Sequence, residues 1–190
     1  VGYGLPSIGG KDSMSGTFNE IDVPPTLVSF AVDIAKTENI ITPELKKEGN
    51  KLVRFAIDKD DYDIPVYEKV LKLYDKIEKL IREKVIVSAY ALDAYGIAAA
   101  ISKMAFGNKI GISVSDEINA EDLFCGALGD IVAEVDANKF SEINCDYDFI
   151  ATVNHSGEFT YKSMTLSIED AITAWSSKLE KVFPTKAEKT

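Results

Sequence analysis

The sequence of 190 residues is poor in the side chains that most often bind zinc or carry out acyl transfer. It has one histidine, His155, and two cysteines, Cys125 and Cys145, neither of which belongs to a Cys-x-x-Cys pair. A structural zinc site needs about four nitrogen or sulfur ligands, so the sequence predicts no metal site and two reduced cysteines. Cys125 also has no base partner, so no glutaminase nucleophile is expected.

The surroundings of His155 argue against a hydrolase triad in the same way. The string Asn154-His155-Ser156-Gly157 is typical of a turn between two paired strands. We therefore expect residues 149–154 and 159–161 to form a hairpin, with His155 in its turn rather than as a catalytic base. The sequence thus predicts no catalytic residue in this chain.

Basic charge and long apolar runs are also lacking. The 31 acidic residues outnumber the 21 lysines and arginines, which gives a net charge of −10. This balance argues against nucleic-acid partners, which need a basic face, and against anionic membranes. No apolar run reaches the ~18 residues of a membrane span, and no signal-peptide pattern is recognised. We therefore expect a cytoplasmic protein whose partners include no nucleic acid and no membrane.

What the sequence does contain is enough apolar periodicity for a sizeable core. Hydrophobic residues make up 46% of the chain, and in residues 66–84 they recur every three to four positions, which predicts an amphipathic helix. Ser167 and Asp170 form a capping box that predicts a terminal helix. Further helices are expected at 97–106 and 120–124, and strands at 26–34, 51–58, 85–90, 110–114 and 130–136. This order predicts an α/β (α+β) fold with a mixed, largely antiparallel sheet packed with helices.

Residues 1–22 differ from the rest because they are rich in glycine and serine, which predicts a long loop. The glycine pair that ends at Gly10 can bring backbone N–H groups close to a phosphate. Lys11 adds a point charge, and Ser13 adds a short donor. The segment is not a Walker loop, because Lys11 stands one residue late and Asp12 replaces the magnesium-binding hydroxyl. These residues favour a phosphate-handling loop, with an ordinary glycine-rich turn as the alternative.

The string Gly10-Lys11-Asp12-Ser13-Met14-Ser15, followed by Val23-Pro24-Pro25-Thr26-Leu27-Val28-Ser29-Phe30-Ala31, resembles the phosphoribosylformylglycinamidine synthases of the large, single-chain form. Lys103-Met104-Ala105-Phe106 and Ala174-Trp175 match the same family in order, so the resemblance covers essentially the whole chain. It implies two fused copies of the aminoimidazole ribonucleotide synthetase fold, each with an ATP-binding lobe and an α/β lobe. The chain would then be a fragment, the C-terminal lobe of the second copy.

This resemblance implies an ATP-dependent C–N ligase, a glutamine amidotransferase of purine biosynthesis. The family converts formylglycinamide ribonucleotide, ATP and glutamine into formylglycinamidine ribonucleotide. ATP and Mg²⁺ are its cofactors, and the remaining synthase domains and a glutaminase domain are the partners of this lobe. By the same resemblance, Gly10 and Lys11 lie near the ATP phosphates and Ser13 lies near the ribonucleotide substrate. The isolated chain is expected to be inactive and to hold no cofactor.

The resemblance fails at one place. Family members carry a His-Asp-x-Ser-x-Gly-Gly string, whose aspartate helps to bind magnesium at an auxiliary nucleotide site. This sequence has Tyr90-Ala91-Leu92-Asp93-Ala94-Tyr95-Gly96 instead. Ala91 cannot bind metal, and Asp93 is expected to cap the following helix or to interact with its dipole. The sequence therefore leaves the auxiliary site open.

The domain organisation that we predict has three parts. Residues 1–22 form a glycine- and serine-rich active-site loop, residues 23–184 form the synthetase-related α/β domain, and residues 185–190 form a tail or linker. Two other functions stay open at this point. The chain could be a non-catalytic binding or scaffolding lobe of a related synthetase-superfamily protein. It could also belong to another enzyme of that superfamily, although the string from Lys11 to Met14 argues against this.

Overall fold

The computed structural model describes residues 2–13, 16–182 and 184 of the chain. The chain forms two compact units, Val1–Ile40 and Ile41–Thr190. The larger unit contains most of the predicted α/β domain, and the smaller unit contains the glycine-rich segment. Met14 and Ser15 of the resemblance string, and the predicted tail at 185–190, lie outside the described residues.

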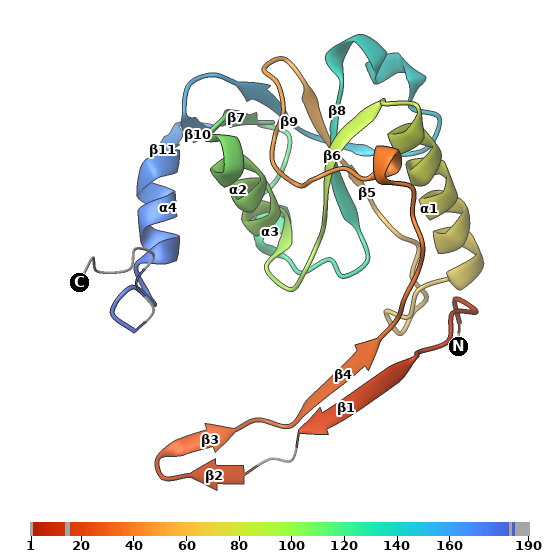
Figure 1. Cartoon of the computed structure of the whole chain (residues 1–190). Coiled ribbons are helices and arrows are strands. Elements are labelled where there is room, and N and C mark those ends of the chain that lie inside the picture. The colour runs from red at the N-terminus through yellow and green to blue at the C-terminus, as the bar shows by residue number, and fades with distance from the viewer. Residues whose placement is uncertain (1, 14–15, 183, 185–190) are drawn as a thin grey trace. The chain divides into compact units, whose positions relative to one another are not determined.

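The larger unit is built on a seven-stranded sheet in the order β11-β10-β7-β9-β5-β8-β6 (Figure 1). Neighbouring strands are antiparallel except β10 and β7, which run parallel. This arrangement confirms the predicted α/β class with a mixed, largely antiparallel sheet. The strands are β5 (Lys51–Phe55), β6 (Ile86–Ala91), β7 (Gly111–Val114), β8 (Ile131–Val135), β9 (Asp148–Asn154), β10 (Glu158–Tyr161) and β11 (Met164–Ser167).

Two hydrophobic cores form where helices pack on this sheet. Because side chains alternate along a strand, Val53 and Phe55 of β5 share one core with Leu80 of α1. Leu52 of the same strand belongs to the other core, together with Met104 of α2. The helices are α1 (Tyr67–Arg82), α2 (Gly96–Asn108), α3 (Ala120–Phe124) and α4 (Ile168–Ser176), with short 3₁₀ helices η1 (Thr37–Asn39) and η2 (Ala137–Glu142).

The terminal helix begins as predicted but ends earlier than its apolar pattern suggests. Ser167 Oγ accepts the N–H of Asp170 at 3.4 Å, which is the expected cap. The helix ends at Ser176, and Leu179 and Val182 beyond it are exposed. An apolar repeat that no neighbouring element covers gains little burial, so it does not sustain helix α4 further.

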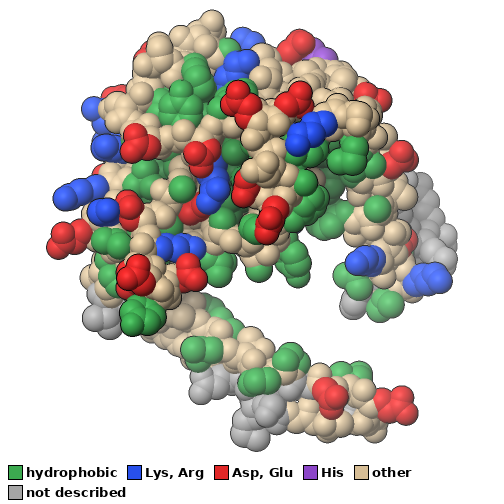
Figure 2. Space-filling view, turned by 180° about the vertical axis from the view of Figure 1, so that it is seen from behind, with side chains coloured by type: hydrophobic (Ala, Val, Ile, Leu, Met, Phe, Trp, Pro, Cys, Tyr) green, Lys and Arg blue, Asp and Glu red, His purple; other side chains and the backbone are tan. Residues whose placement is uncertain are grey.

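The surface of the larger unit carries both signs of charge. In Figure 2, lysine and arginine side chains alternate with acidic ones on the face in view and do not gather into one basic patch. Exposed pairs such as Arg82 with Glu78, 3.1 Å apart on α1, contribute to this pattern. Among the described helices, none is both long and apolar enough to cross a bilayer.

The strands before and after His155 do not pair with each other, so the predicted hairpin is wrong. β7 lies between β9 and β10, antiparallel to the former and parallel to the latter. The connection passes close to Gly111, where an added Cβ would lie 2.3 Å from Asn154 Oδ1 and 2.4 Å from Ser156 Oγ. Glycine at position 111 therefore leaves room for the connection that runs from β9 past β7 to β10. The local turn pattern around His155 does not reveal that β7 lies between these two strands.

The smaller unit is not the long loop that composition predicts for residues 1–22. β1 (Gly9–Ser13) pairs antiparallel with β4 (Thr26–Phe30), and β2 (Gly16–Phe18) pairs with β3 (Ile21–Val23). β4 lies within the strand predicted at 26–34, but its residues are exposed rather than buried. Glycine weakens a strand and offers no side chain to pack, so composition alone hides β1. The backbone hydrogen bonds to β4 hold residues 9–13 in a strand instead.

Candidate functional site

β1 carries the residues that the sequence singles out for phosphate binding. Gly10 and Lys11 lie inside this strand, opposite Ser29 and Val28 of β4. An added Cβ at Gly10 would lie 3.1 Å from the carbonyl oxygen of Val28, so glycine permits the close approach of the two strands. Lys11 is exposed. Ser13 is the last residue of β1, and its side chain is not among those that the structure describes.

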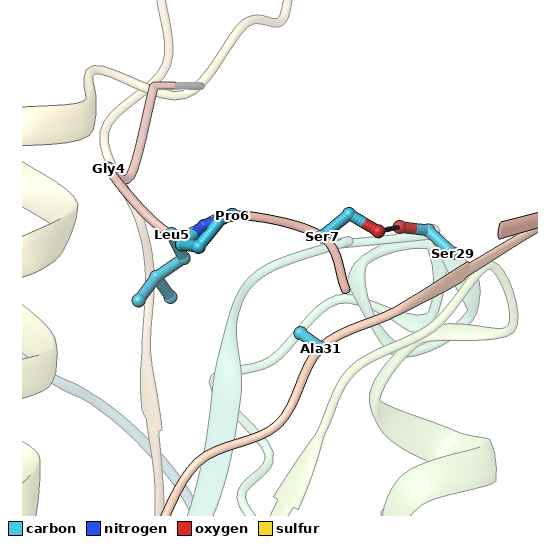
Figure 3. A pocket seen from close by; sticks show the side chains of 6 residues that line it. All are labelled: Gly4, Leu5, Pro6, Ser7, Ser29 and Ala31. Atoms are coloured by element: carbon cyan, nitrogen blue, oxygen red, sulfur yellow. Dashed lines mark hydrogen bonds between the residues drawn. The ribbon is translucent and has the colours of Figure 1, made fainter. Parts of the chain in front are cut away.

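A pocket of about 690 Å³ lies beside β1 and β4 in the same unit (Figure 3). Ser7 Oγ lies 2.9 Å from Ser29 Oγ and donates to the carbonyl oxygen of Gly9 at 2.7 Å. Hydroxyl groups can bind an anion, but without the added strength of a charged donor. A phosphate here would therefore need a cation from outside the lining. The lining consists of Gly4, Leu5, Pro6, Ser7, Ser29 and Ala31.

The position of the family's metal-binding aspartate lies at the end of β6. Ala91 is the last residue of that strand and offers no ligand. Asp93 follows in the turn before α2: its Oδ1 accepts the N–H of Tyr95 at 2.8 Å, and its Oδ2 lies 3.4 Å from Lys103 Nζ. The Tyr95 N–H bond, and then Lys103, lower the pKa of Asp93. Asp93 thus stabilises the turn into α2, whereas Tyr95 occupies the N-cap.

No metal centre is apparent in the part of the chain that the structure describes. Within residues 2–13, 16–182 and 184, no three His, Cys, Asp or Glu side chains form a group that could hold an ion. The carboxylate of Asp93 already accepts hydrogen bonds from the N–H of Tyr95 and from Lys103 Nζ. The geometry therefore gives no support to an auxiliary metal site built on Asp93.

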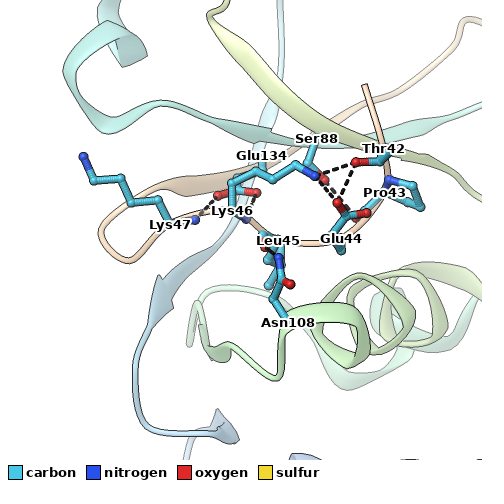
Figure 4. A network of polar contacts seen from close by, with 9 residues as sticks. All are labelled: Thr42, Pro43, Glu44, Leu45, Lys46, Lys47, Ser88, Asn108 and Glu134. Carbon is cyan, nitrogen blue, oxygen red and sulfur yellow. Dashed lines mark hydrogen bonds and ion pairs between the residues drawn. The ribbon is translucent and has the colours of Figure 1, made fainter. Parts of the chain in front are cut away.

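A buried network that sequence reasoning missed holds the segment before β5 (Figure 4). Glu134 of β8 is fully buried. Its Oε2 accepts the N–H of Lys46 at 2.8 Å, and its Oε1 accepts the N–H of Lys47 at 3.0 Å and Nδ2–H of Asn50 at 2.7 Å. Burial raises the pKa of Glu134, although these three donors oppose the rise. The signal in the sequence is one glutamate inside an otherwise apolar strand.

The same segment is also held on its exposed side (Figure 4). Glu44 Oε1 accepts hydrogen bonds from Lys46 Nζ and, at 2.6 Å, from Thr42 Oγ1. These bonds, led by the one from Lys46, lower the pKa of Glu44 to about 2. Asn108 Nδ2 of α2 donates to the carbonyl oxygen of Leu45 at 2.8 Å. These contacts and the Glu134 network join residues of the larger unit to one another, and they hold the segment before β5 in place.

An ion pair lies at the other end of β5. Arg54 Nε donates to Asp130 Oδ2 at 2.7 Å, and Asp130 Oδ1 accepts the N–H of Ile57 at 3.0 Å. The Asp130 side chain is only 3% exposed, whereas Asp148, 3.9 Å from Arg54 Nη1, is well exposed. Arg54 therefore neutralises a buried carboxylate and is not a free cation for a ligand.

Comparison with known proteins gives a fold rather than a family model. No family model matches the chain. Thermotoga maritima PurL in complex with AMPPCP aligns with a TM-score of 0.58 and 17% identity, over 76% of this chain and 28% of that one. Phosphoribosylformylglycinamidine synthase II from the same organism aligns with a TM-score of 0.57 and 15% identity, over 87% of this chain and 30% of that one. The chain has the fold of part of PurL.

The likeness to PurL confirms the sequence resemblance at the level of the fold. The chain shares its fold with part of phosphoribosylformylglycinamidine synthase II, the enzyme that the sequence resemblance implies. The chain spans less than a third of the length of these PurL chains. T. maritima PurL is also known in complexes with ATP and with FGAR, and in an assembly named PurLQS. The roles of Gly10, Lys11 and Ser13 remain predictions.

Proposed function

We propose that the chain is part of a phosphoribosylformylglycinamidine synthase, which uses ATP and glutamine to convert formylglycinamide ribonucleotide into formylglycinamidine ribonucleotide. One observation carries the proposal: the string Gly10-Lys11-Asp12-Ser13 lies on strand β1 of a chain with the PurL fold. The two supports are independent. The string is a match of residue identities, whereas the fold likeness to PurL holds although only 15–17% of the aligned residues are identical.

In this function, Gly10 and Lys11 bind the ATP phosphates and Ser13 binds the ribonucleotide. Lys11 is exposed, and lysine is a strongly hydrated point charge suited to a phosphate. The absence of a side chain at Gly10 already lets the backbone of β4 approach closely at Val28. Phosphoryl transfer is mostly positioning and charge stabilisation. The chain would therefore contribute a cation and backbone N–H groups rather than an acid or a base.

The proposed reaction has two steps. ATP phosphorylates the amide oxygen of the substrate, and ammonia released from glutamine then displaces the phosphate. Mg²⁺ would accompany the ATP, and because the described residues offer no group of three ligands for it, other domains would hold it. The remaining synthase domains and a glutaminase domain are the partners, in the cytoplasm. The division into an active-site segment at 1–22, a domain at 23–184 and a tail at 185–190 belongs to the same proposal, with strands β1 and β2 in the first segment instead of a loop.

The test uses the longer synthase that would contain this sequence. Lys11→Ala should lower kcat/KM for amidine formation about 100-fold, because removing one electrostatic contact to developing charge costs about this much. Ser13→Ala should raise KM for the ribonucleotide about tenfold, since it removes one neutral hydrogen bond. Lys36→Ala is the control, because Lys36 is another exposed lysine of the same unit, and its kcat/KM should stay within about twofold.

Two outcomes would count against the proposal. Near-wild-type kcat/KM for Lys11→Ala, at unchanged thermal stability, would remove β1 from the active site. A longer protein that forms no amidine from ATP, ammonia and formylglycinamide ribonucleotide would favour the non-catalytic scaffold instead. The isolated chain of 190 residues should show no turnover, because it lacks a recognisable ATP lobe.

A further inference from the structure

A second pocket, of about 620 Å³, lies in the larger unit, and residues of α2, α3 and α4 are among those that line it. Helix α2 contacts both α3 and α4, and the three helices are labelled in Figure 1. The proposed reaction does not use it, and no residue of the smaller unit lines it. Small side chains of α2, Ala98, Ala99 and Ser102, leave the space beside the helix. The Ser102 hydroxyl donates back to the carbonyl oxygen of Ala98 at 2.7 Å. This wall of the pocket is therefore mostly apolar.

Three aromatic side chains from three different elements line the same pocket. Tyr95 precedes α2, Phe124 ends α3 and Trp175 lies on α4; they are 72%, 69% and 64% exposed. The Trp175 ring packs against Phe106 with centroids 5.7 Å apart, and this contact helps to fix its position. Large aromatic side chains are usually buried in a core or an interface. Their exposure around one pocket of mostly small residues suits stacking with a planar ring.

Ala94 and two lysines also line the pocket, and no carboxylate belongs to this lining. Lys103 Nζ lies 3.0 Å from the Tyr90 hydroxyl and 3.4 Å from Asp93 Oδ2. The Tyr90 hydroxyl, and then Asp93, raise the pKa of Lys103, so it stays charged at neutral pH. For Lys178, the described residues provide no ion-pair partner. Because Lys103 is paired with Asp93, Lys178 is the lysine of this lining whose charge no described carboxylate balances, and in a chain with a net charge of −10 it favours an anionic ligand at the aromatic pocket.

We infer that this pocket binds a small molecule with a planar aromatic ring and one anionic group, such as a nucleoside monophosphate or an aryl carboxylate. The ring would stack among Phe124, Tyr95 and Trp175, and the anionic group would pair with Lys178, with Lys103 nearby. Neither the string on β1 nor turnover is needed for this binding. The inference therefore stands apart from the proposed function.

The ligand class can be tested directly because Trp175 is the only tryptophan of the chain. Its fluorescence reports occupancy of the pocket in the full chain of 190 residues. AMP and 1-naphthoate supply a ring with a phosphate or a carboxylate, adenosine supplies a ring without charge, and ribose 5-phosphate supplies a charge without a ring. At least one of the two ringed anions should change the fluorescence saturably. Adenosine and ribose 5-phosphate should bind at least about tenfold more weakly than that anion.

Variants then locate the binding. Lys178→Ala should weaken the binding of the ringed anion about tenfold, because it removes a charge-assisted contact. Lys181→Ala removes the same charge from an exposed neighbour that does not line the pocket, so its affinity should match the wild type. Phe124→Ala should also weaken binding. All three positions are exposed, and circular dichroism should show an unchanged fold.

Three results would overturn the inference. The first is the absence of a saturable change with either ringed anion. The second is equal binding of adenosine and AMP together with no binding of naphthoate, which would show that charge plays no part. The third is equal affinity in Lys178→Ala and Lys181→Ala. None of these results bears on Lys11, so they are distinguishable from a failure of the proposed synthase function.

Discussion

Glu134→Gln tests whether the buried carboxylate holds the segment before β5 against the sheet. The carboxylate accepts three hydrogen bonds of 2.7–3.0 Å. Glutamine keeps the shape but replaces one accepting oxygen with an NH₂ group, which can only donate. In the less costly orientation this group faces the N–H of Lys46 alone. Loss of that bond, which leaves the N–H of Lys46 without its acceptor, should lower the free energy of unfolding by about 1–3 kcal/mol at neutral pH.

Urea unfolding followed by far-UV circular dichroism measures this loss. Glu121→Gln is the matched control, because Glu121 is exposed on α3, and it should change the free energy of unfolding by less than about 0.5 kcal/mol. A loss below about 1 kcal/mol for Glu134→Gln would refute the reasoning. It would mean that the segment is held by its other contacts and that the carboxylate contributes little.

The pH dependence of the same variant has a defined sign. Burial raises the pKa of Glu134 above its ordinary value of 4.5, so the folded state binds this proton more tightly than the unfolded state. The associated stability is fully present below that value and is lost as the pH rises through the pKa of the folded state. Glutamine does not titrate. The difference in unfolding free energy between wild type and Glu134→Gln should therefore shrink from mildly acidic to neutral pH.

The remaining predictions concern stability and use the same urea assay. Gly111→Ala should lower the free energy of unfolding by about 1–3 kcal/mol, because the new Cβ would clash with the connection between β9 and β10. Gly16→Ala, with nothing within 4 Å of the Cβ position, is its control, and equal midpoints for the two variants would disprove the clash. Arg54→Met should cost about 3–5 kcal/mol, because it leaves Asp130 buried without its ion pair. Arg82→Met breaks an exposed pair and should cost less than about 1 kcal/mol; a similar loss in both variants would contradict the argument from burial.

The elements of the larger unit were predictable where the apolar pattern is long. In α1, buried positions such as Val70, Ile77 and Leu80 recur at helical spacing, so the helix predicted at 66–84 is confirmed within a few residues. The cap at Ser167 also follows from local chemistry, because a serine at the N-cap can accept the N–H of the residue three positions later. Both features depend only on neighbours along the chain.

The pairing of strands was not predictable in the same way. β9 and β10 are separated by a short turn string, and nothing in that string shows that Gly111 of β7 comes between them. β11 was missed because its four residues, all partly or fully exposed, give no clear apolar alternation. The role of Glu134 was missed because its partners, 84–88 positions away, become neighbours only in the folded sheet.

The candidate sites show the same division. The string from Gly10 to Ser13 is contiguous, so the sequence alone keeps these residues together, although it predicts a loop where the structure has strand β1. The pocket of the larger unit joins Phe124 of α3 to Trp175 of α4 and to Lys178 just beyond that helix. Each of these residues, taken alone, is an ordinary surface residue. Only the packing of α2 against α3 and α4 brings them to one place.

The order of the strands in the sheet also determines in which sequence, and how fast, the larger unit can fold. In its sheet only β10 and β11 form a hairpin; every other pair joins distant segments, as Ala91 with Ile131 or Lys51 with Val135. Non-local pairing gives a high contact order, which slows folding to about milliseconds to seconds. During synthesis β5 and β6 must wait for β8 to leave the ribosome. Stopped-flow refolding read from Trp175 should accordingly show a slow main phase, whereas microsecond folding would mean that helices α1 and α2 organise the unit before its sheet.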